Sequence, residues 1–179
     1  MKTYKNLYPK ICDFNNLHAA WRKARRGKRY KQAAASFERN LDDELTHLHS
    51  ELTTQTWQPG GYRSFIVHEP KWRKISAAPF ADRVVHHALN AVIEPIYERK
   101  FIDDSYANRV GKGTHKALDR CTYFMRRYRY VLQCDVRQFF PAIDHAILKD
   151  ILGRTIACQP TLDLCGRIID SGVGVLTDQ

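Results

Sequence analysis

The chain has 179 residues, of which 44% are hydrophobic and 27% charged, a composition typical of a globular protein that can bury a core. No apolar run approaches the ~20 residues of a membrane-spanning helix, and the start lacks a signal-peptide core, so we expect a cytoplasmic protein with no membrane partner. The net charge is +10, and the first forty residues hold eleven Lys or Arg against only Asp13 and Glu38, a pattern that favours polyanion binding.

The densest part of this basic region is Trp21–Lys31, which mixes cationic side chains with two aromatic ones. Cations neutralise phosphates, and aromatic rings can stack on bases. A basic helix that is merely solvated is the competing interpretation, and a thin apolar face argues against an anionic membrane surface. We therefore predict a nucleic-acid-binding arm that uses Arg22, Lys23, Arg25, Arg26, Lys28 and Arg29.

The first half of the chain predicts helices around one hairpin. Apolar residues recur every three or four positions from Phe37 to Leu52, which predicts an amphipathic helix of about 17 residues. Residues 62–68 and 73–77 have β-forming composition, and a turn around Glu69-Pro70-Lys71 would join them. Pro79 suits the first turn of a helix that carries a broad apolar face as far as Ile96.

The second half alternates a loop, helices and one short apolar run. A loop is expected over residues 101–113, with Thr114 as the N-cap of the next helix. The apolar run that starts at Val131 predicts a buried strand. Asp144 is expected to cap a short helix, and Thr161 to begin another that ends at Asp170. The mixture is α+β in character, helix-rich with a small antiparallel sheet.

Three segments have the chemistry to bind phosphate or metal, and the first is the hairpin. Because side chains alternate along a strand, Lys71 and Arg73 should point the same way and Lys74 the other. Two cations on one face of a hairpin can clamp a triphosphate. Taken alone, an exposed basic hairpin is the simpler interpretation.

The second segment is SYANRVGKGTHKAL, residues 105–118, in which Arg109 and Lys112 precede a helix. Its glycines permit close backbone approach, and a helix N-terminus attracts anions. The spacing is not that of a P-loop, so this motif is weak by itself.

The third segment is VLQCDVRQFF, residues 131–140, which delivers Asp135 to the end of the expected strand. A carboxylate is a hard ligand suited to Mg²⁺, and Phe139 and Phe140 could wall a sugar pocket. A strand-end Asp that caps a turn is the alternative.

In this order the segments resemble motifs of the bacterial reverse transcriptases of the retron, group II intron and diversity-generating types. HEPKWRKISAAPFADRVVHHAL resembles their first motif, FIDDSYANRVGKGTHKAL their second and CDVRQFFPAIDH their motif A. The resemblance covers roughly residues 57–179. It implies a partial right-hand polymerase, with fingers over 56–130 and an incomplete palm over 131–179. The charge distribution places a basic helical arm over 1–55, before the fingers.

The resemblance also implies roles and partners. Asp135 would be the catalytic metal ligand in a two-Mg²⁺ site, joined by the carbonyl of Val136. Lys71 and Arg73 would contact the incoming triphosphate, and Phe140 would be the steric gate against a 2′-hydroxyl. Arg109 with its turn would help hold template and fingers, and Lys112 in that turn would bind nucleic acid. The partners implied are an RNA template, a DNA primer and a deoxynucleoside triphosphate.

The Tyr-x-Asp-Asp hairpin that completes the metal site of this family is missing from the sequence. Asp42-Asp43 and Asp103-Asp104 follow Leu41 and Ile102, and neither pair lies between two expected strands. One carboxylate is a poor counter-charge for two Mg²⁺ ions. We therefore expect a truncated, amino-terminal reverse transcriptase fragment that is inactive unless a carboxy-terminal palm and thumb polypeptide is supplied. A non-catalytic RNA-binding module or scaffold is the alternative.

Overall fold

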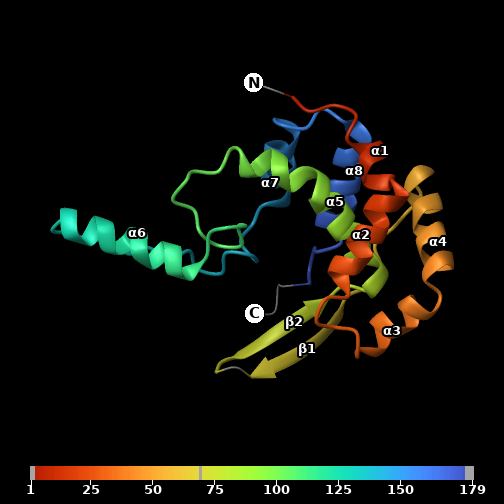
Figure 1. The fold of residues 1–179 in the computed structure, drawn as a ribbon, viewed down its shortest axis with the longest axis horizontal. Helices are drawn as coiled ribbons and strands as arrows, with labels where there is room; N and C mark the ends of the chain where they lie inside the picture. The colour runs from red at the N-terminus through yellow and green to blue at the C-terminus, as the bar shows by residue number, and fades with distance from the viewer. Residues whose placement is uncertain (1–2, 69, 176–179) are drawn as a thin grey trace. The chain divides into compact units, whose positions relative to one another are not determined.

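The computed structural model describes residues 3–68 and 70–175, and the chain forms two compact units. Unit 1 comprises residues 1–92 and 138–179, and unit 2 comprises residues 93–137 (Figure 1). The fold is helix-rich with a two-stranded antiparallel sheet, which confirms the expected α+β class. None of the helices in the described ranges is long and apolar enough to span a lipid bilayer.

The amino-terminal part of unit 1 is a layer of helices: α1 (Tyr8–Cys12), α2 (Phe14–Ala24), α3 (Gln32–Arg39) and α4 (Leu41–Thr53). Asp13 caps α2 by accepting a hydrogen bond from the Asn16 amide at 3.1 Å. Helices α1, α2 and α4 pack together, and the Tyr8 hydroxyl donates to the Leu52 carbonyl at 2.6 Å. The basic region therefore belongs to a packed layer of helices.

The amphipathic helix predicted from Phe37 to Leu52 is two helices. Asn40, with φ −114° and ψ 39°, separates α3 from α4. Phe37 is buried on α3 beside Phe80, with 5.1 Å between ring centroids, whereas Leu45 is buried on α4. Both helices bury apolar side chains, so the spacing of buried residues does not reveal the break between them. Asn leaves helical geometry at little cost, which explains the position of the break.

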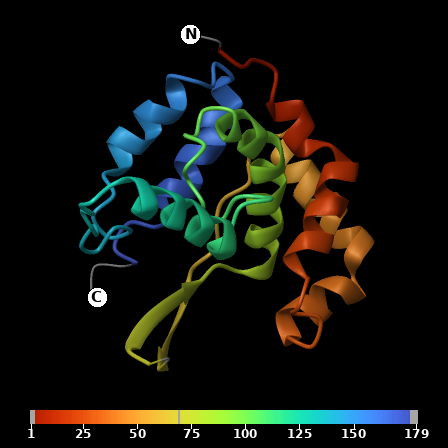
Figure 2. The ribbon, with the colours of Figure 1, turned by 60° about the vertical axis from the view of Figure 1, so that its left-hand side comes forward.

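The predicted hairpin is present. Strands β1 (Arg63–His68) and β2 (Trp72–Ala77) pair antiparallel, with His68 opposite Trp72 and Val67 opposite Arg73. Glu69, from the predicted turn, lies outside the described residues. The two strands extend away from the helices of unit 1 (Figures 1 and 2). Both faces of this hairpin are open, because Ile66 is 68% exposed and Ile75 40% exposed.

Helix α5 (Phe80–Glu98) follows Pro79 as predicted. Within unit 1 it buries Val84, Val85 and Ala88. The Asp82 carboxylate accepts a hydrogen bond from the Gly60 amide at 2.8 Å, which fixes the chain that leads into β1. A side chain at Gly60 would place Cβ 2.9 Å from Pro79, so this approach requires glycine.

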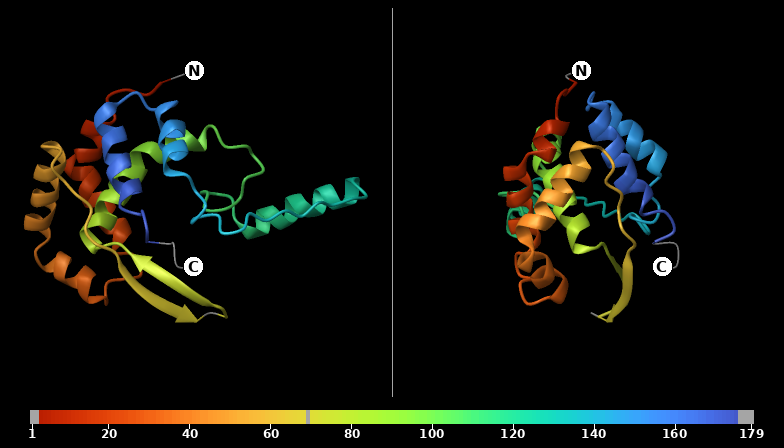
Figure 3. Two further views of the ribbon diagram at one scale, coloured as in Figure 1. Left: turned by 180° about the vertical axis from the view of Figure 1, so that it is seen from behind. Right: turned by 90° about the vertical axis from the view of Figure 1, so that its right-hand side faces the viewer.

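The carboxy-terminal part of unit 1 is the helix pair α7 (His145–Gly153) and α8 (Gln159–Asp170), which lie side by side (Figures 2 and 3). Asp144 caps α7 as predicted, accepting from the amides of residues 146 and 147 at 2.8 and 3.0 Å. Helix α8 begins two residues before the predicted Thr161. Arg167 on α8 donates to the carbonyls of Gln55 and Trp57 at 2.6 and 2.9 Å. These hydrogen bonds join α8 to the segment that connects α4 with β1.

Unit 2 contains the end of α5, a loop, α6 (Thr114–Arg127) and the segment that carries Asp135. Gly113, with φ 110°, is the N-cap, so Thr114 is the first helical residue and not the predicted cap. The predicted buried strand at residues 131–135 is wrong: these residues are exposed and form no strand. A strand needs a neighbour, and the strands of the described chain pair only with each other.

Candidate nucleic-acid and nucleotide interface

The basic segment lies at the end of α2 and in the turn before α3. Five of its six predicted cations are exposed, namely Arg22, Lys23, Arg26, Lys28 and Arg29. Arg25 differs, because its guanidinium forms an ion pair with Glu38 and lies 4.3 Å from the centre of the Trp21 ring. Trp21 is only 6% exposed, so it serves the core and cannot stack on bases. Tyr30, at 79% exposed, is the aromatic of this segment that is open to a ligand.

The predicted triphosphate clamp lies on the hairpin of unit 1. Lys71 immediately precedes β2 and Arg73 is within it, and both side chains are exposed. Lys74 is half-buried, which agrees with its expected orientation to the opposite face. The hairpin therefore offers two cations to solvent.

Arg109 is the centre of the loop in unit 2. Its side chain is 10% exposed, and its Nε donates to the Glu98 carboxylate at 2.9 Å. Its Nη1 also donates to the carbonyls of Ile102 and Ser105, at 2.8 and 3.1 Å. Because these contacts use most of its donors, Arg109 acts within the loop as a positioning residue.

Two further ion pairs stabilise the loop, one within it and one to the middle of α6. Lys112 donates to the Asp103 carboxylate at 2.7 Å, and Arg120 donates to the Asp104 carboxylate at 2.9 Å. These hydrogen bonds from Lys112 and from Arg120 lower the pKa of Asp103 and of Asp104, respectively. The carboxylates of Asp103 and Asp104 are thus counter-ions of Lys112 and Arg120 within unit 2. Sequence reasoning missed this role, although the nearby cations were a usable signal.

Asp135 and Val136, the predicted metal ligands, are both exposed in unit 2. Among the residues that the structure describes, no three His, Cys, Asp or Glu side chains gather to hold a metal ion. A site for two Mg²⁺ ions needs several carboxylates. The described residues therefore do not by themselves fit the two-metal site that the sequence motif implies.

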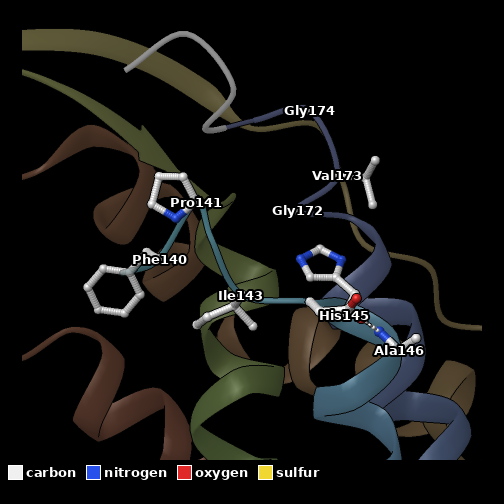
Figure 4. A pocket seen from close by; sticks show the side chains of 9 residues that line it. Phe140, Pro141, Ile143, His145, Ala146, Gly172, Val173 and Gly174 are labelled. Carbon is white, nitrogen blue, oxygen red and sulfur yellow. Dashed lines mark hydrogen bonds between the residues drawn. The ribbon is translucent and has the colours of Figure 1, made fainter. Parts of the chain in front are cut away.

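Phe140, the predicted steric gate, borders a hollow of about 410 Å³ in unit 1 (Figure 4). Its ring is 72% exposed and meets the Phe139 ring edge-on, with 5.3 Å between centroids. Across the hollow, the His145 ring lies beside Gly172, where an added Cβ would be 3.9 Å from the imidazole.

Comparison with known proteins identifies the class of protein to which this chain is related. No family model matches the chain. The chain is, however, a low-identity homologue of proteins encoded by group II introns and of intron maturases, which confirms the reverse transcriptase resemblance in its coarse form.

Three relatives show the extent of the similarity. The group II intron-encoded protein LtrA of Lactococcus lactis is 23% identical over 154 residues, which cover 80% of this chain and 26% of LtrA. Protein YkfC of Escherichia coli is 26% identical, over 72% of this chain and 36% of that protein. Nuclear intron maturase 2 of Arabidopsis thaliana is 24% identical, over 73% of this chain and 20% of that protein. The chain thus spans about a third or less of these relatives.

Proposed function

We propose that this protein binds RNA and contributes the fingers and one catalytic carboxylate to a reverse transcriptase. The observation that carries the proposal is the combination, in a homologue of intron maturases, of an exposed basic segment, a cationic hairpin and Asp135. Each feature alone has a simpler explanation, whereas a template-directed polymerase needs all three.

The RNA grip is the exposed part of the basic segment. Its cations can neutralise backbone phosphates, and Tyr30 can stack on a base. Arg25 supports this surface from within, because its pairing with Glu38 and its stacking on Trp21 hold the end of α2 in place.

The nucleotide-binding groups are Lys71 and Arg73 on the hairpin and Phe140 at the hollow in unit 1. Exposed cations on a hairpin favour a polyphosphate. An aromatic ring at the edge of a hollow can exclude a sugar that carries a 2′-hydroxyl. The incoming nucleotide would then be a deoxynucleoside triphosphate, and the primer a DNA strand.

The described residues of this chain do not complete a metal site. Asp135 and the Val136 carbonyl would hold Mg²⁺, whose chemistry would be to stabilise charge on a transferred phosphoryl group. The remaining carboxylates must come from another polypeptide segment. We therefore propose little or no polymerase activity for this chain alone.

A non-catalytic RNA-binding module is the second candidate. The exposed basic segment with Tyr30 favours it, because this surface functions without Asp135. In that case Phe140 and Asp135 have no assigned function.

Template–primer extension separates the two functions. The assay combines this chain, the part of LtrA carboxy-terminal to the matched region, Mg²⁺ and deoxynucleotides. A polymerase component yields synthesis that Asp135→Ala abolishes while RNA binding is retained. RNA binding with no synthesis in any combination would leave the binding module as the function.

A further inference from the structure

Arg83, on the part of α5 that belongs to unit 1, is half-buried and has no acidic partner. Its guanidinium carbon lies 5.2 Å from the centre of the Phe80 ring. None of the ion pairs within residues 3–68 and 70–175 includes Arg83. A cation that is partly removed from water is normally paired with an anion. Arg83 therefore has the capacity to bind an anionic ligand.

Two polar atoms on this side of α5 are also without a partner. Arg83 Nε and His86 Nε2 are buried, and neither has a hydrogen-bond partner among the described residues. Residues three apart lie on the same side of a helix. Buried polar groups nearly always have a partner, so two exceptions on one side of a helix point to a missing ligand. No hydrogen bond holds the Arg83 guanidinium, which leaves it free to turn toward such a ligand.

The basic segment lies beside this part of α5. The Asn16 side chain on α2 donates to the Ala88 carbonyl of α5 at 3.1 Å, which joins the two helices. Lys23 follows Asn16 by seven residues, so it lies two turns further along the same side of α2. Lys28 follows in the turn after α2, and both lysine side chains are exposed.

His87 lies at the centre of these cations. Burial, followed by the charges of Lys23, Lys28 and Arg83, lowers the pKa of His87. No carboxylate is among the groups that act on it. The pKa of its neighbour His86 is lowered too, by burial first and then by the charges of His87 and Arg83. Two parts of the chain thus place three permanent cations around one half-buried imidazole.

We propose that Lys23, Lys28 and Arg83 bind a phosphate group of RNA beside His87, and that His87 takes up a proton as this phosphate binds. The inference rests on the proposed RNA binding and extends the contact surface from the basic segment to α5. The guanidinium fork of Arg83 matches a phosphate, on which it can make two parallel hydrogen bonds. The phosphate charge offsets the repulsion by the three cations, so the imidazolium form of His87 becomes favourable.

Proton uptake makes RNA affinity depend on pH with a definite sign. Without RNA, the pKa of His87 is below its ordinary value, so the imidazole is neutral at neutral pH. Bound RNA raises this pKa, so the complex holds more protons than the free chain and affinity rises as pH falls. We expect affinity to be about three- to tenfold higher near pH 5.5 than near pH 7.5, since one proton changes affinity by at most tenfold per pH unit.

Nuclear magnetic resonance of the histidine rings tests the site directly. The full chain is titrated with acid in the absence and in the presence of a short single-stranded RNA, without Mg²⁺ or nucleotide. RNA should raise the midpoint of the His87 titration. His47 is the internal control, because it lies on α4 in unit 1 and pairs with Glu51 at 3.4 Å, and its midpoint should stay unchanged.

Matched variants connect this titration to affinity. His87→Gln should weaken the pH dependence of RNA binding, whereas His47→Gln should retain it. Arg83→Gln should reduce the slope of log affinity against log salt concentration by about 0.7, and Arg83→Lys should retain most of the slope. Circular dichroism at each pH restricts the comparison to folded protein. If Arg83→Gln does not fold, the ring titration of the wild-type chain still decides the question.

Three results would overturn the proposal: equal changes of the His87 and His47 midpoints, equal pH dependence of RNA binding in His87→Gln and the wild-type chain, or no RNA binding at any pH. The first two would remove the site on α5 and leave RNA binding by the basic segment intact. The third would refute the proposed RNA-binding function as well.

Discussion

The Arg109–Glu98 pair makes the loop of unit 2 sensitive to a substitution that removes the charge of Glu98. Glu98→Gln keeps the size of the side chain but removes the charge opposite a guanidinium that is 10% exposed. Removal of one partner of a fully buried pair costs about 3–5 kcal/mol. The Glu98 side chain is 30% exposed, so solvent screens the pair and we expect a loss of about 1.5–3 kcal/mol in local stability.

Amide hydrogen exchange measures this loss where it occurs. The Lys112 amide donates to the Arg109 carbonyl at 3.2 Å and reports on the loop. Its exchange should accelerate about ten- to a hundredfold in Glu98→Gln, since each tenfold corresponds to about 1.4 kcal/mol. Asp103→Asn is the control, because it breaks the pair of Lys112 with a carboxylate that is 90% exposed. Equal acceleration in the two variants would refute the central role of Arg109.

Three further predictions concern RNA, sugar selection and pH. Neutralising Arg22 and Arg26 should reduce the slope of log affinity for single-stranded RNA against log salt concentration by about 0.7 per side chain. The control Arg154→Gln should leave this slope unchanged. A slope that none of these substitutions changes would contradict electrostatic RNA binding by the basic segment. Phe140→Ala should admit ribonucleotides in the reconstituted polymerase, and unchanged discrimination would remove the gate. Burial, followed by the charges of neighbouring His87 and Arg83, lowers the pKa of His86, so the folded state loses stability as pH falls through about 6.5. Urea unfolding of His86→Gln should show a shallower loss between about pH 7 and 5, and an identical profile would exclude this cause.

Local patterns predicted the elements whose determinants are local. The capping position of Asp144 correctly predicted the start of α7. The β-forming composition on either side of Pro70 correctly predicted the hairpin. The Asn40 break was missed, because a hydrophobic period reports which face is buried and not whether one helix or two carry it.

The failures at the candidate site share one physical cause, namely packing and pairing contacts that composition and hydrophobic period do not specify. The strand predicted at Val131 requires a neighbouring strand, which composition cannot reveal. Arg109 was predicted as a ligand contact, but Glu98 and the loop carbonyls occupy its donors. Trp21 was predicted as an accessible ring, but the packing of α2 buries it.

Metal binding is the decisive measurement, because we propose that this chain supplies one carboxylate, Asp135, and that another polypeptide segment supplies the rest. Calorimetric titration of Mg²⁺ is compared for the chain alone, for its complex with the LtrA-derived polypeptide, and for the same complex with Asp135→Asn. We expect specific binding in the wild-type complex only. Equal affinity in the chain alone, or full affinity in the complex that carries Asp135→Asn, would contradict it.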